Sequence, residues 1–118
     1  MKYIYIAGPL SKGDQAANIR IAIHHANLCL RYGLIPFLPH LTWFWHLVTP
    51  KEYEEWLSLD DAWLQKCDAV FRIAGESAGV DREVARAREL GLPVFTDPQE
   101  LFEWATGKAT TGIGSALP

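Results

Sequence analysis

Two acidic side chains lie on helix faces that the sequence otherwise makes apolar. The pattern of residues 80–90 predicts a helix on which Glu83 shares a face with Val80 and Ala87. Another helix is predicted over residues 49–66, and Asp60 lies at the centre of its apolar stripe of Tyr53, Trp56, Leu57, Trp63, Leu64 and Cys67. A carboxylate on such a face is either satisfied by polar partners or kept for chemistry. Two carboxylates are what cleavage at an anomeric carbon needs, because one attacks or stabilises positive charge while the other handles protons or hydroxyls.

Each acid also has a structural interpretation. Asp60 alone is explained by a hydrogen bond to a nearby loop backbone, and its neighbour Asp61 points away from the stripe as an ordinary solvated acid. In a purely structural oligomer, the two acids would be buried and paired with Arg72 or Arg82. Two such acids on successive helices that flank one sheet favour a function over this alternative.

A hydroxyl and a glycine stand just before Glu83, where a strand passes into its helix. Residues 68–73 have the pattern of a strand, and Ser77-Ala-Gly-Val-Asp-Arg-Glu83 opens the following helix. Open α/β sheets place their ligands at the carboxyl ends of strands, and free N–H groups at a helix start suit an anion. Ser77 and Gly79 are therefore expected to contact an anionic group.

The loop after the first expected strand is a second candidate for binding. Ser11 and Lys12 follow a Gly-Pro turn and are suited to hold a phosphate. A surface loop explains them almost as well, because the stretch is not a Walker-type motif. We expect this loop to meet residues 77–83, so the substrate-binding candidates include Gly8, Pro9, Leu10, Ser11 and Lys12.

Tyr5, His40 and an aromatic run are weaker candidates. Tyr5 alternates with Ile4 and Ile6, and taken alone it fits a core aromatic slightly better than a site phenol. His40 is suited to line the pocket. Residues 42–48, Thr-Trp-Phe-Trp-His-Leu-Val, are expected to form a loop that covers the core, with stacking on a base as the alternative.

Short apolar strands alternate with helices along the chain. Strands are expected over residues 3–7, 34–38, 68–73 and 93–95, and helices over residues 14–32, 49–66, 80–90 and 97–105, with caps at Asp14, Thr49 and Asp97. This alternation predicts an α/β fold: a single flavodoxin-like (Rossmann-like) domain, with a parallel sheet of four or five strands flanked by helices. Pro36 argues for an edge position of the second strand. The domain is expected to span residues 1–105, and residues 106–118 to form a flexible tail.

The bulk properties exclude several classes of protein. The 118 residues suffice for one domain, and the net charge of −3 gives no basic face for nucleic acid. The chain shows neither a membrane-spanning apolar run nor a leader before the first strand, which favours a cytoplasmic protein without membrane contact. Cys29 and Cys67 are expected to be free buried thiols, and no metal site is expected. The helix over residues 14–32 is apolar on two faces, which predicts a homodimer or higher homo-oligomer.

Three stretches of the chain carry a resemblance to a known family. They are Tyr3-Ile-Tyr-Ile-Ala-Gly-Pro-Leu10, Asp60-Asp-Ala-Trp-Leu-Gln-Lys-Cys-Asp68 and Ser77-x-Gly-x-x-x-Glu83. With them, residues 2–95 resemble the nucleoside 2-deoxyribosyltransferase superfamily. The resemblance is closest to its branch of deoxynucleoside 5′-monophosphate N-glycosidases and DUF4406 proteins.

The resemblance implies a role for each acid. Glu83 matches the glutamate nucleophile that attacks C1′ of the sugar, and Asp60 matches an aspartate that assists it. Tyr5 matches a tyrosine that helps to hold the nucleophile or the sugar. No cofactor is implied for this chemistry.

The resemblance also implies a phosphorylated substrate. Enzymes for free nucleosides tend to carry an aspartate where Ser77 stands, whereas the monophosphate hydrolases carry a serine, because an aspartate would repel the phosphate. Ser11, Lys12 and Gly79 would complete the phosphate cradle, although the hydrolases prefer arginine at the position of Lys12. The implied function is an N-glycosidase acting on (deoxy)nucleoside 5′-monophosphates. The alternatives are a deoxyribosyltransferase, whose acceptor is a base in place of water, and a noncatalytic nucleotide-binding module on the same fold.

Overall fold

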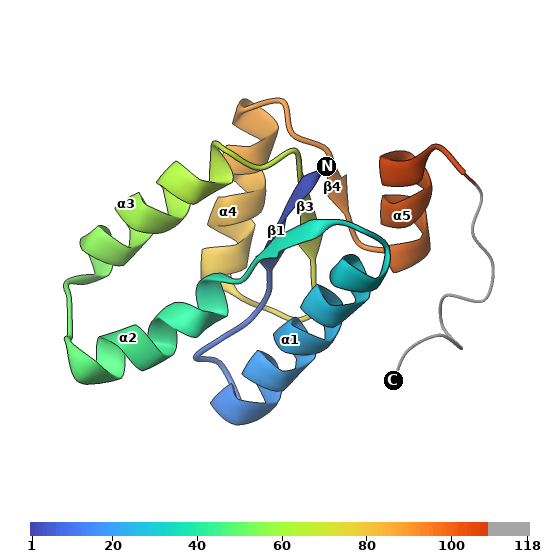
Figure 1. Cartoon of the computed structure of the whole chain (residues 1–118). Helices are drawn as coiled ribbons and strands as arrows, with labels where there is room; N and C mark the ends of the chain where they lie inside the picture. Colours follow the sequence, from blue (N-terminus) through green and yellow to red (C-terminus); the bar gives the residue numbers. More distant parts are fainter. Residues whose placement is uncertain (109–118) are drawn as a thin grey trace.

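The computed structural model describes residues 1–108, in which strands and helices alternate (Figure 1). The expected tail lies outside the described residues from residue 109 onward. In chain order the elements are β1 (Tyr3–Ala7), α1 (Gln15–Arg31), β2 (Ile35–Phe37), a 3₁₀ turn η1 (Pro39–Leu41), α2 (Thr42–Val48), α3 (Tyr53–Leu64), β3 (Ala69–Arg72), α4 (Ala78–Glu89), β4 (Val94–Phe95) and α5 (Pro98–Thr106).

The strands form one parallel sheet in the order β2-β1-β3-β4. Tyr5 of β1 stands opposite Phe37 of β2 on one side and Val70 of β3 on the other. The parallel α/β fold is therefore confirmed, and β2 with Pro36 lies at an edge, as predicted. The strand order reverses between β1 and β3, and such a point leaves a crevice for ligands at the carboxyl ends of the strands.

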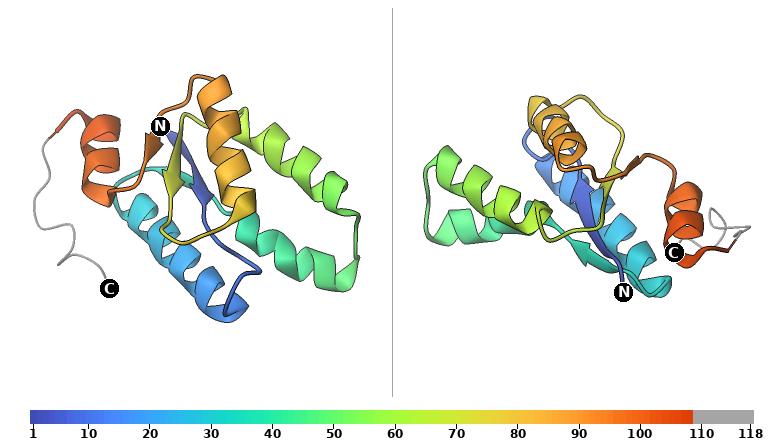
Figure 2. Two further views of the ribbon diagram at one scale, coloured as in Figure 1. Left: turned by 180° about the vertical axis from the view of Figure 1, so that it is seen from behind. Right: turned by 90° about the horizontal axis from the view of Figure 1, so that it is seen from above.

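Side chains of β1 alternate between two separate cores. Ile4 and Ile6 pack on the side of α1 and α5, whereas Tyr5 and Ala7 pack on the side of α4 and the end of α3. Helices thus cover both faces of the sheet, and Figure 2 shows the same layers from behind and from above. The alternation directs Tyr5 toward α4, the helix that carries Glu83.

Local signals set several helix ends as predicted. The carboxylates of Asp14 and Asp97 each accept a hydrogen bond from a backbone N–H of the following helix, at 3.1 and 3.0 Å. Gly33 follows the end of α1 with a φ of 75°, a conformation that favours glycine. These ends fix α1 and α5 against one face of the sheet.

The aromatic run Thr42–Val48 is the helix α2, so the predicted loop is wrong. The preceding turn η1 leads directly into it, and the Thr42 hydroxyl donates to the Pro39 carbonyl at 2.7 Å. None of the residues of α2 is buried, so the run has no buried apolar stripe and does not cover the core. The sequence pattern could not reveal the helix, because its side chains face a cavity and the surface.

The start of α3 also differs from the prediction. Thr49 is the last residue of the α2 turn, because its N–H donates to the carbonyl of Trp45 at 2.8 Å, and it does not cap α3. The cap position of α3 belongs to Glu52, and its side chain makes no capping bond. As a result, α2 and α3 are two arms that extend away from the sheet (Figure 1).

Both cysteines are free and buried, as predicted. Burial raises the pKa of the Cys29 thiol to about 12 and that of Cys67 to about 11, so neither is a thiolate at neutral pH.

Within residues 1–108, no helix has the length and apolar character required to cross a membrane.

Candidate active site

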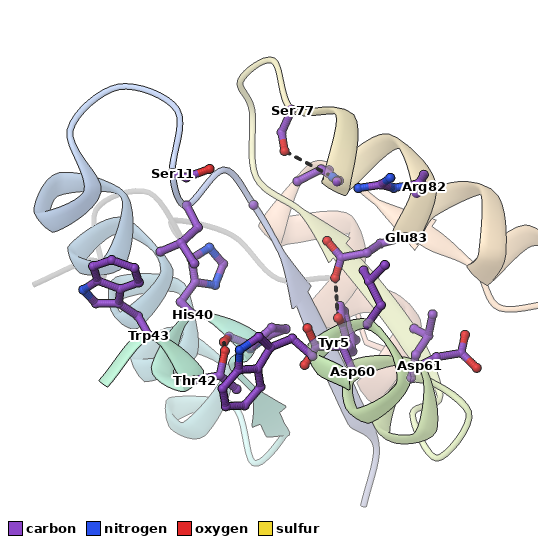
Figure 3. A pocket seen from close by; sticks show the side chains of 18 of the residues that line it. Tyr5, Ser11, His40, Thr42, Trp43, Asp60, Asp61, Ser77, Arg82 and Glu83 are labelled. Carbon is purple, nitrogen blue, oxygen red and sulfur yellow. Dashed lines mark hydrogen bonds between the residues drawn. The ribbon is translucent and has the colours of Figure 1, made fainter. Parts of the chain in front are cut away.

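A cavity of about 670 Å³ opens over the carboxyl ends of β1 and β3. Its walls come from the loop after β1, from η1, and from the helices α2, α3 and α4 (Figure 3). Most of the candidates from the sequence line it: Tyr5, Gly8, Leu10, Ser11, His40, Asp60, Ser77, Gly79 and Glu83. Pro9 and Lys12 are not among the lining residues.

Tyr5 and Glu83 meet at the floor of this cavity. The hydroxyl of Tyr5, on β1, donates a hydrogen bond to a carboxylate oxygen of Glu83, on α4 (Figure 3). Burial raises the pKa of Glu83 to about 7, and the negative charge of Asp60 adds to this rise, whereas the Tyr5 hydrogen bond opposes it. Burial, together with the nearby Glu83 carboxylate, raises the pKa of Tyr5 as well, so its hydroxyl keeps its proton. Tyr5 is therefore both a core aromatic and a hydrogen-bond donor in the cavity.

Asp60 reaches the same part of the cavity from α3. Its Oδ1 atom is buried and has no hydrogen-bond partner within residues 1–108. Burial raises the pKa of this carboxyl to about 6. The structural pairing with arginine is not formed, because Arg72 pairs with Asp81 at 3.4 Å and Arg82 donates to the hydroxyl of Tyr53.

The loops after β1 and β3 pack directly on each other, as predicted. A Cβ atom on Gly8 would lie 2.9 Å from Cδ1 of Ile73, and one on Gly75 would lie 2.8 Å from Cγ of Pro9. Gly75 also has a φ of 128°, which other residues rarely adopt. Glycine is therefore required at both positions for the two loops to meet at the cavity rim.

The start of α4 faces the cavity. Ser77 caps this helix, because its Oγ accepts a hydrogen bond from the N–H of Val80 at 3.2 Å. Gly79 adds a stretch of backbone without a side chain beside it. The helix start and its hydroxyl thus offer donors to an anionic group, and Ser11 lines the same cavity from the loop after β1.

Lys12 is placed differently from the other loop candidates. Its Nζ lies 2.9 Å from a carboxylate oxygen of Glu76, and both side chains are exposed. This ion pair joins the loop after β1 to the loop after β3. Lys12 therefore contacts the residue that precedes Ser77, but its side chain does not line the cavity.

His40 holds the loop after β1. It is buried, and its Nε2 lies 3.2 Å from the carbonyl oxygen of Pro9. A carbonyl can only accept, so Nε2 carries the proton, and burial lowers the pKa of the ring. The neutral imidazole lines the cavity as expected, and Pro9 contributes through this backbone contact.

An aromatic wall lines the cavity, which the sequence analysis foresaw only as an alternative for the run that contains Trp43. Trp43 and His46 of α2 line the cavity together with Tyr53 and Trp56 of α3. Nδ1 of His46 accepts hydrogen bonds from Nε1 of Trp56 at 2.8 Å and from the N–H of Lys51 at 3.2 Å. These hydrogen bonds connect α2 to α3 and to the loop between them, and the wall offers aromatic surface to a planar ligand.

Asp61 is partly exposed, as expected for an acid that points away from the apolar stripe, but it also forms an ion pair at the cavity lining. It turns away from Asp60 (Figure 3), but Nε of Arg86 donates to its Oδ1 at 2.8 Å. The side-chain amide of Gln65 donates to its other oxygen at 2.7 Å. These bonds lower the pKa of Asp61, with the Arg86 bond as the largest cause.

Within residues 1–108, no three His, Cys, Asp or Glu side chains are grouped so that they could hold a metal ion.

Family membership follows from a comparison with protein-family models. The model described as Domain of unknown function (DUF7768) matches residues 2–97. The chain belongs to this family. The expected closeness to DUF4406 and to the monophosphate glycosidases is not confirmed by this match. A search of curated proteins finds no match.

Solved structures share the fold of this DUF7768 domain. A 2-deoxyribosyltransferase from Bacillus psychrosaccharolyticus is 22% identical with a TM-score of 0.57, over 78% of this chain and 69% of that one. A conserved protein from Enterococcus faecalis V583 is 21% identical with a TM-score of 0.61, over 80% and 61%. A 2-deoxyribosyltransferase from Leishmania mexicana is 19% identical with a TM-score of 0.59, over 80% and 62%. The likeness confirms the expected deoxyribosyltransferase-like fold, and the matched parts span between 61% and 69% of these chains.

Proposed function

We propose that the protein is an N-glycosidase that cleaves the base–sugar bond of (deoxy)nucleoside 5′-monophosphates through Glu83. The observation that carries this proposal is the group of Tyr5, Glu83 and Asp60 in one cavity. Tyr5 donates to Glu83, while Asp60 presents a buried oxygen that has no hydrogen-bond partner among residues 1–108. Two acids with raised pKa values in a cleft are typical of a site for acid–base and nucleophilic chemistry.

The proposed reaction has two steps. In the first step, a carboxylate oxygen of Glu83 forms a bond to C1′ as the bond from C1′ to the base nitrogen breaks, and its electron pair leaves with the base. Asp60 supplies a proton to the base or orients a sugar hydroxyl. In the second step, the oxygen of a water molecule bonds to C1′ and a carboxylate takes its proton. The ester breaks, and Glu83 is restored with release of the sugar phosphate.

The cavity has two chemically distinct ends that suit the two ends of a nucleotide. The start of α4, with Ser77 and Gly79, supports an assignment as the phosphate end, and Ser11 adds a hydroxyl. The aromatic wall of Trp43 and Trp56 supports an assignment as the base end. The acids would then lie beside the sugar, between base and phosphate.

A transferase uses the same first step, and this alternative is worth testing because two of the structures that share the fold are deoxyribosyltransferases. Each deoxynucleoside 5′-monophosphate would be incubated with the protein, with and without a second free base, and the products separated by chromatography. We expect free base and sugar phosphate in both incubations, and no release with Glu83→Ala. A new nucleotide that carries the added base would identify a transferase. Saturable binding without product would instead identify a noncatalytic module, and undiminished release by Glu83→Ala would contradict the role of Glu83.

We also propose that the chain acts as a homo-oligomer in the cytoplasm. The surface of α1 supports self-association, because Ile21, Ile23 and Leu30 remain exposed on it. Sedimentation of the protein, and of a variant with Ile21→Ser and Leu30→Ser, tests this face. We expect the variant to sediment as a smaller species, and an unchanged mass would contradict the assignment.

A further inference from the structure

Asp61 and Arg86 form a bridge between the two helices that carry the acids. Nε of Arg86, on α4, donates to Oδ1 of Asp61, on α3, at 2.8 Å. Asp61 directly follows Asp60 in the chain, and Arg86 lies about one helical turn after Glu83. The bridge therefore joins α3 to α4 at the level of the acid pair.

The aromatic contacts of α3 reach α2 and β2, through Trp56 against His46 and Trp63 against Phe37, whereas its spacing from α4 rests on other contacts. The helix extends away from the sheet (Figure 1), and Leu64, at its C-terminal end, is its buried residue. Near its other end, Tyr53 is half exposed and accepts a hydrogen bond from Arg82. The position of Asp60 relative to Glu83 thus depends on a contact between these two helices.

We propose that Asp61 and Arg86 are positioning residues that set the spacing between Asp60 and Glu83. Each of the two side chains has a second hydrogen-bond partner. The amide of Gln65 donates to Asp61 at 2.7 Å, and Arg86 also contacts Glu89, one turn further along α4, at 3.2 Å. These contacts engage both side chains of the bridge from a second direction.

Both bridge residues also line the cavity, and the role assigned to them here is to set the spacing of the two acids. The positive charge that bears on the pKa of Glu83 is that of Arg82, whereas the charge of Arg86 is matched by Asp61 and Glu89. A reacting group displaced by about 1 Å loses on the order of 100-fold in rate. The catalytic consequence rests on the proposed function, but the spacing of the two acids does not.

A double-mutant cycle tests the bridge by turnover. Asp61→Ala and Arg86→Ala should each lower kcat by about 100-fold, with little change of KM. The double variant should be no slower than either single variant, because both remove the same bridge. Arg86→Lys should recover part of the rate, and the matched control Arg88→Ala, an exposed arginine of α4 that does not line the cavity, should keep the wild-type rate. Unchanged kcat in the single variants, or losses that multiply in the double variant, would overturn the proposal.

A second measurement does not need turnover. The carboxyl groups of Asp60 and Glu83 would be titrated by carbon NMR in the wild type, in Asp61→Ala and, in case that variant does not fold, in Asp61→Asn. We expect the pKa of Asp60 to fall toward that of an ordinary aspartate when the bridge is lost, because water then reaches it. An unchanged titration of both acids would refute the positioning role. A shifted titration in a protein whose wild type has no activity would refute the proposed function and keep the bridge.

Discussion

The hydroxyl of Tyr5 donates a hydrogen bond to the carboxylate of Glu83, although the two residues are 78 positions apart in the chain. It connects the central strand β1 to the helix α4 at the crevice of the sheet. Burial and the charge of Asp60 favour the protonated form of Glu83, whereas this hydrogen bond favours the ionised form. Tyr5 thus keeps the proposed nucleophile closer to its reactive state.

Replacing Tyr5 by phenylalanine should shift the pH dependence of activity upward. The acid form of Glu83 cannot attack, so kcat/KM should fall as the pH decreases through about 7 in the wild type. Without the hydrogen bond the pKa of Glu83 rises further, and the midpoint of this fall should move to higher pH. A hydrogen bond to a charged group contributes about 1.5–3 kcal/mol, so kcat/KM at pH 7 should drop by roughly 10- to 100-fold.

Tyr3→Phe is the matched control for this substitution. Tyr3 lies on the same strand, but it is half exposed and does not line the cavity. Its pH profile should coincide with that of the wild type. If Tyr5→Phe also kept the wild-type profile, Tyr5 would be a packing residue without influence on Glu83.

Replacing Glu83 by glutamine should abolish turnover and stabilise the fold at alkaline pH. In the folded protein Glu83 keeps its proton up to about pH 7, whereas an unfolded glutamate loses it near 4.5. The folded state therefore binds more protons in this window, and its stability falls as the pH rises from 4.5 to 7, by on the order of 3 kcal/mol. Glutamine does not titrate, so the variant should escape this loss.

Urea unfolding at several pH values measures this effect. Wild type and Glu83→Gln should have similar free energies of unfolding at pH 4, and the variant should be the more stable one at pH 8. The control Glu54→Gln changes an exposed glutamate of α3, and its stability should follow that of the wild type. A variant that is less stable than the wild type at pH 8 would show that the Glu83 carboxylate is satisfied rather than strained by its surroundings.

Much of the fold could be predicted because its signals are local. The alternation of Ile4, Tyr5 and Ile6 marks a strand with two covered faces, and Asp14 and Asp97 cap helices by bonds within one turn. The helix α2 could not be predicted in this way. Its residues have no common buried side, and its start depends on the turn at Pro39 rather than on a periodic pattern.

The same distinction applies to the candidate site, where some residues could be predicted from local patterns and others depend on contacts between distant elements. Glu83 and Asp60 were found because each breaks an apolar pattern within its own helix. The bridge from Asp61 to Arg86 and the wall of Trp43 arise only when α2, α3 and α4 come together in space. No spacing within one element encodes such contacts, so a single sequence leaves them open.

Removing an indole from the aromatic wall should weaken substrate binding more than it slows chemistry. Trp43→Ala takes away a stacking surface at the proposed base end, and stacking on one base contributes about 1–3 kcal/mol. KM should therefore rise by roughly 10-fold or more, with a smaller change of kcat. Trp104→Ala is the control, because that indole packs on Phe95 of β4 and is outside the cavity. Equal effects of both substitutions would indicate general loosening of the fold and not a base-binding surface.

Replacing Ser77 by aspartate should separate its two roles at the start of α4, which are capping of the helix and the proposed binding of a phosphate. Aspartate is as good a helix cap as serine, so it should accept the hydrogen bond from Val80 and keep the melting temperature near that of the wild type. Its charge would repel a bound phosphate by several kcal/mol at contact distance, as Coulomb's law gives for a partly exposed pair. KM for a deoxynucleoside monophosphate should therefore rise by more than about 10-fold. KM for the corresponding free nucleoside should not rise, since its 5′-hydroxyl can donate to the new carboxylate.

The exchange in the opposite direction supplies the control. Asp97→Ser alters the cap of α5, which lies on the other side of the sheet from α4, and it should change neither Michaelis constant. Equal rises of KM for the nucleotide and the nucleoside in Ser77→Asp would place the phosphate elsewhere. A loss of stability without any change of KM would reduce Ser77 to a helix cap, and the substrate would then be expected to lack a phosphate at this position.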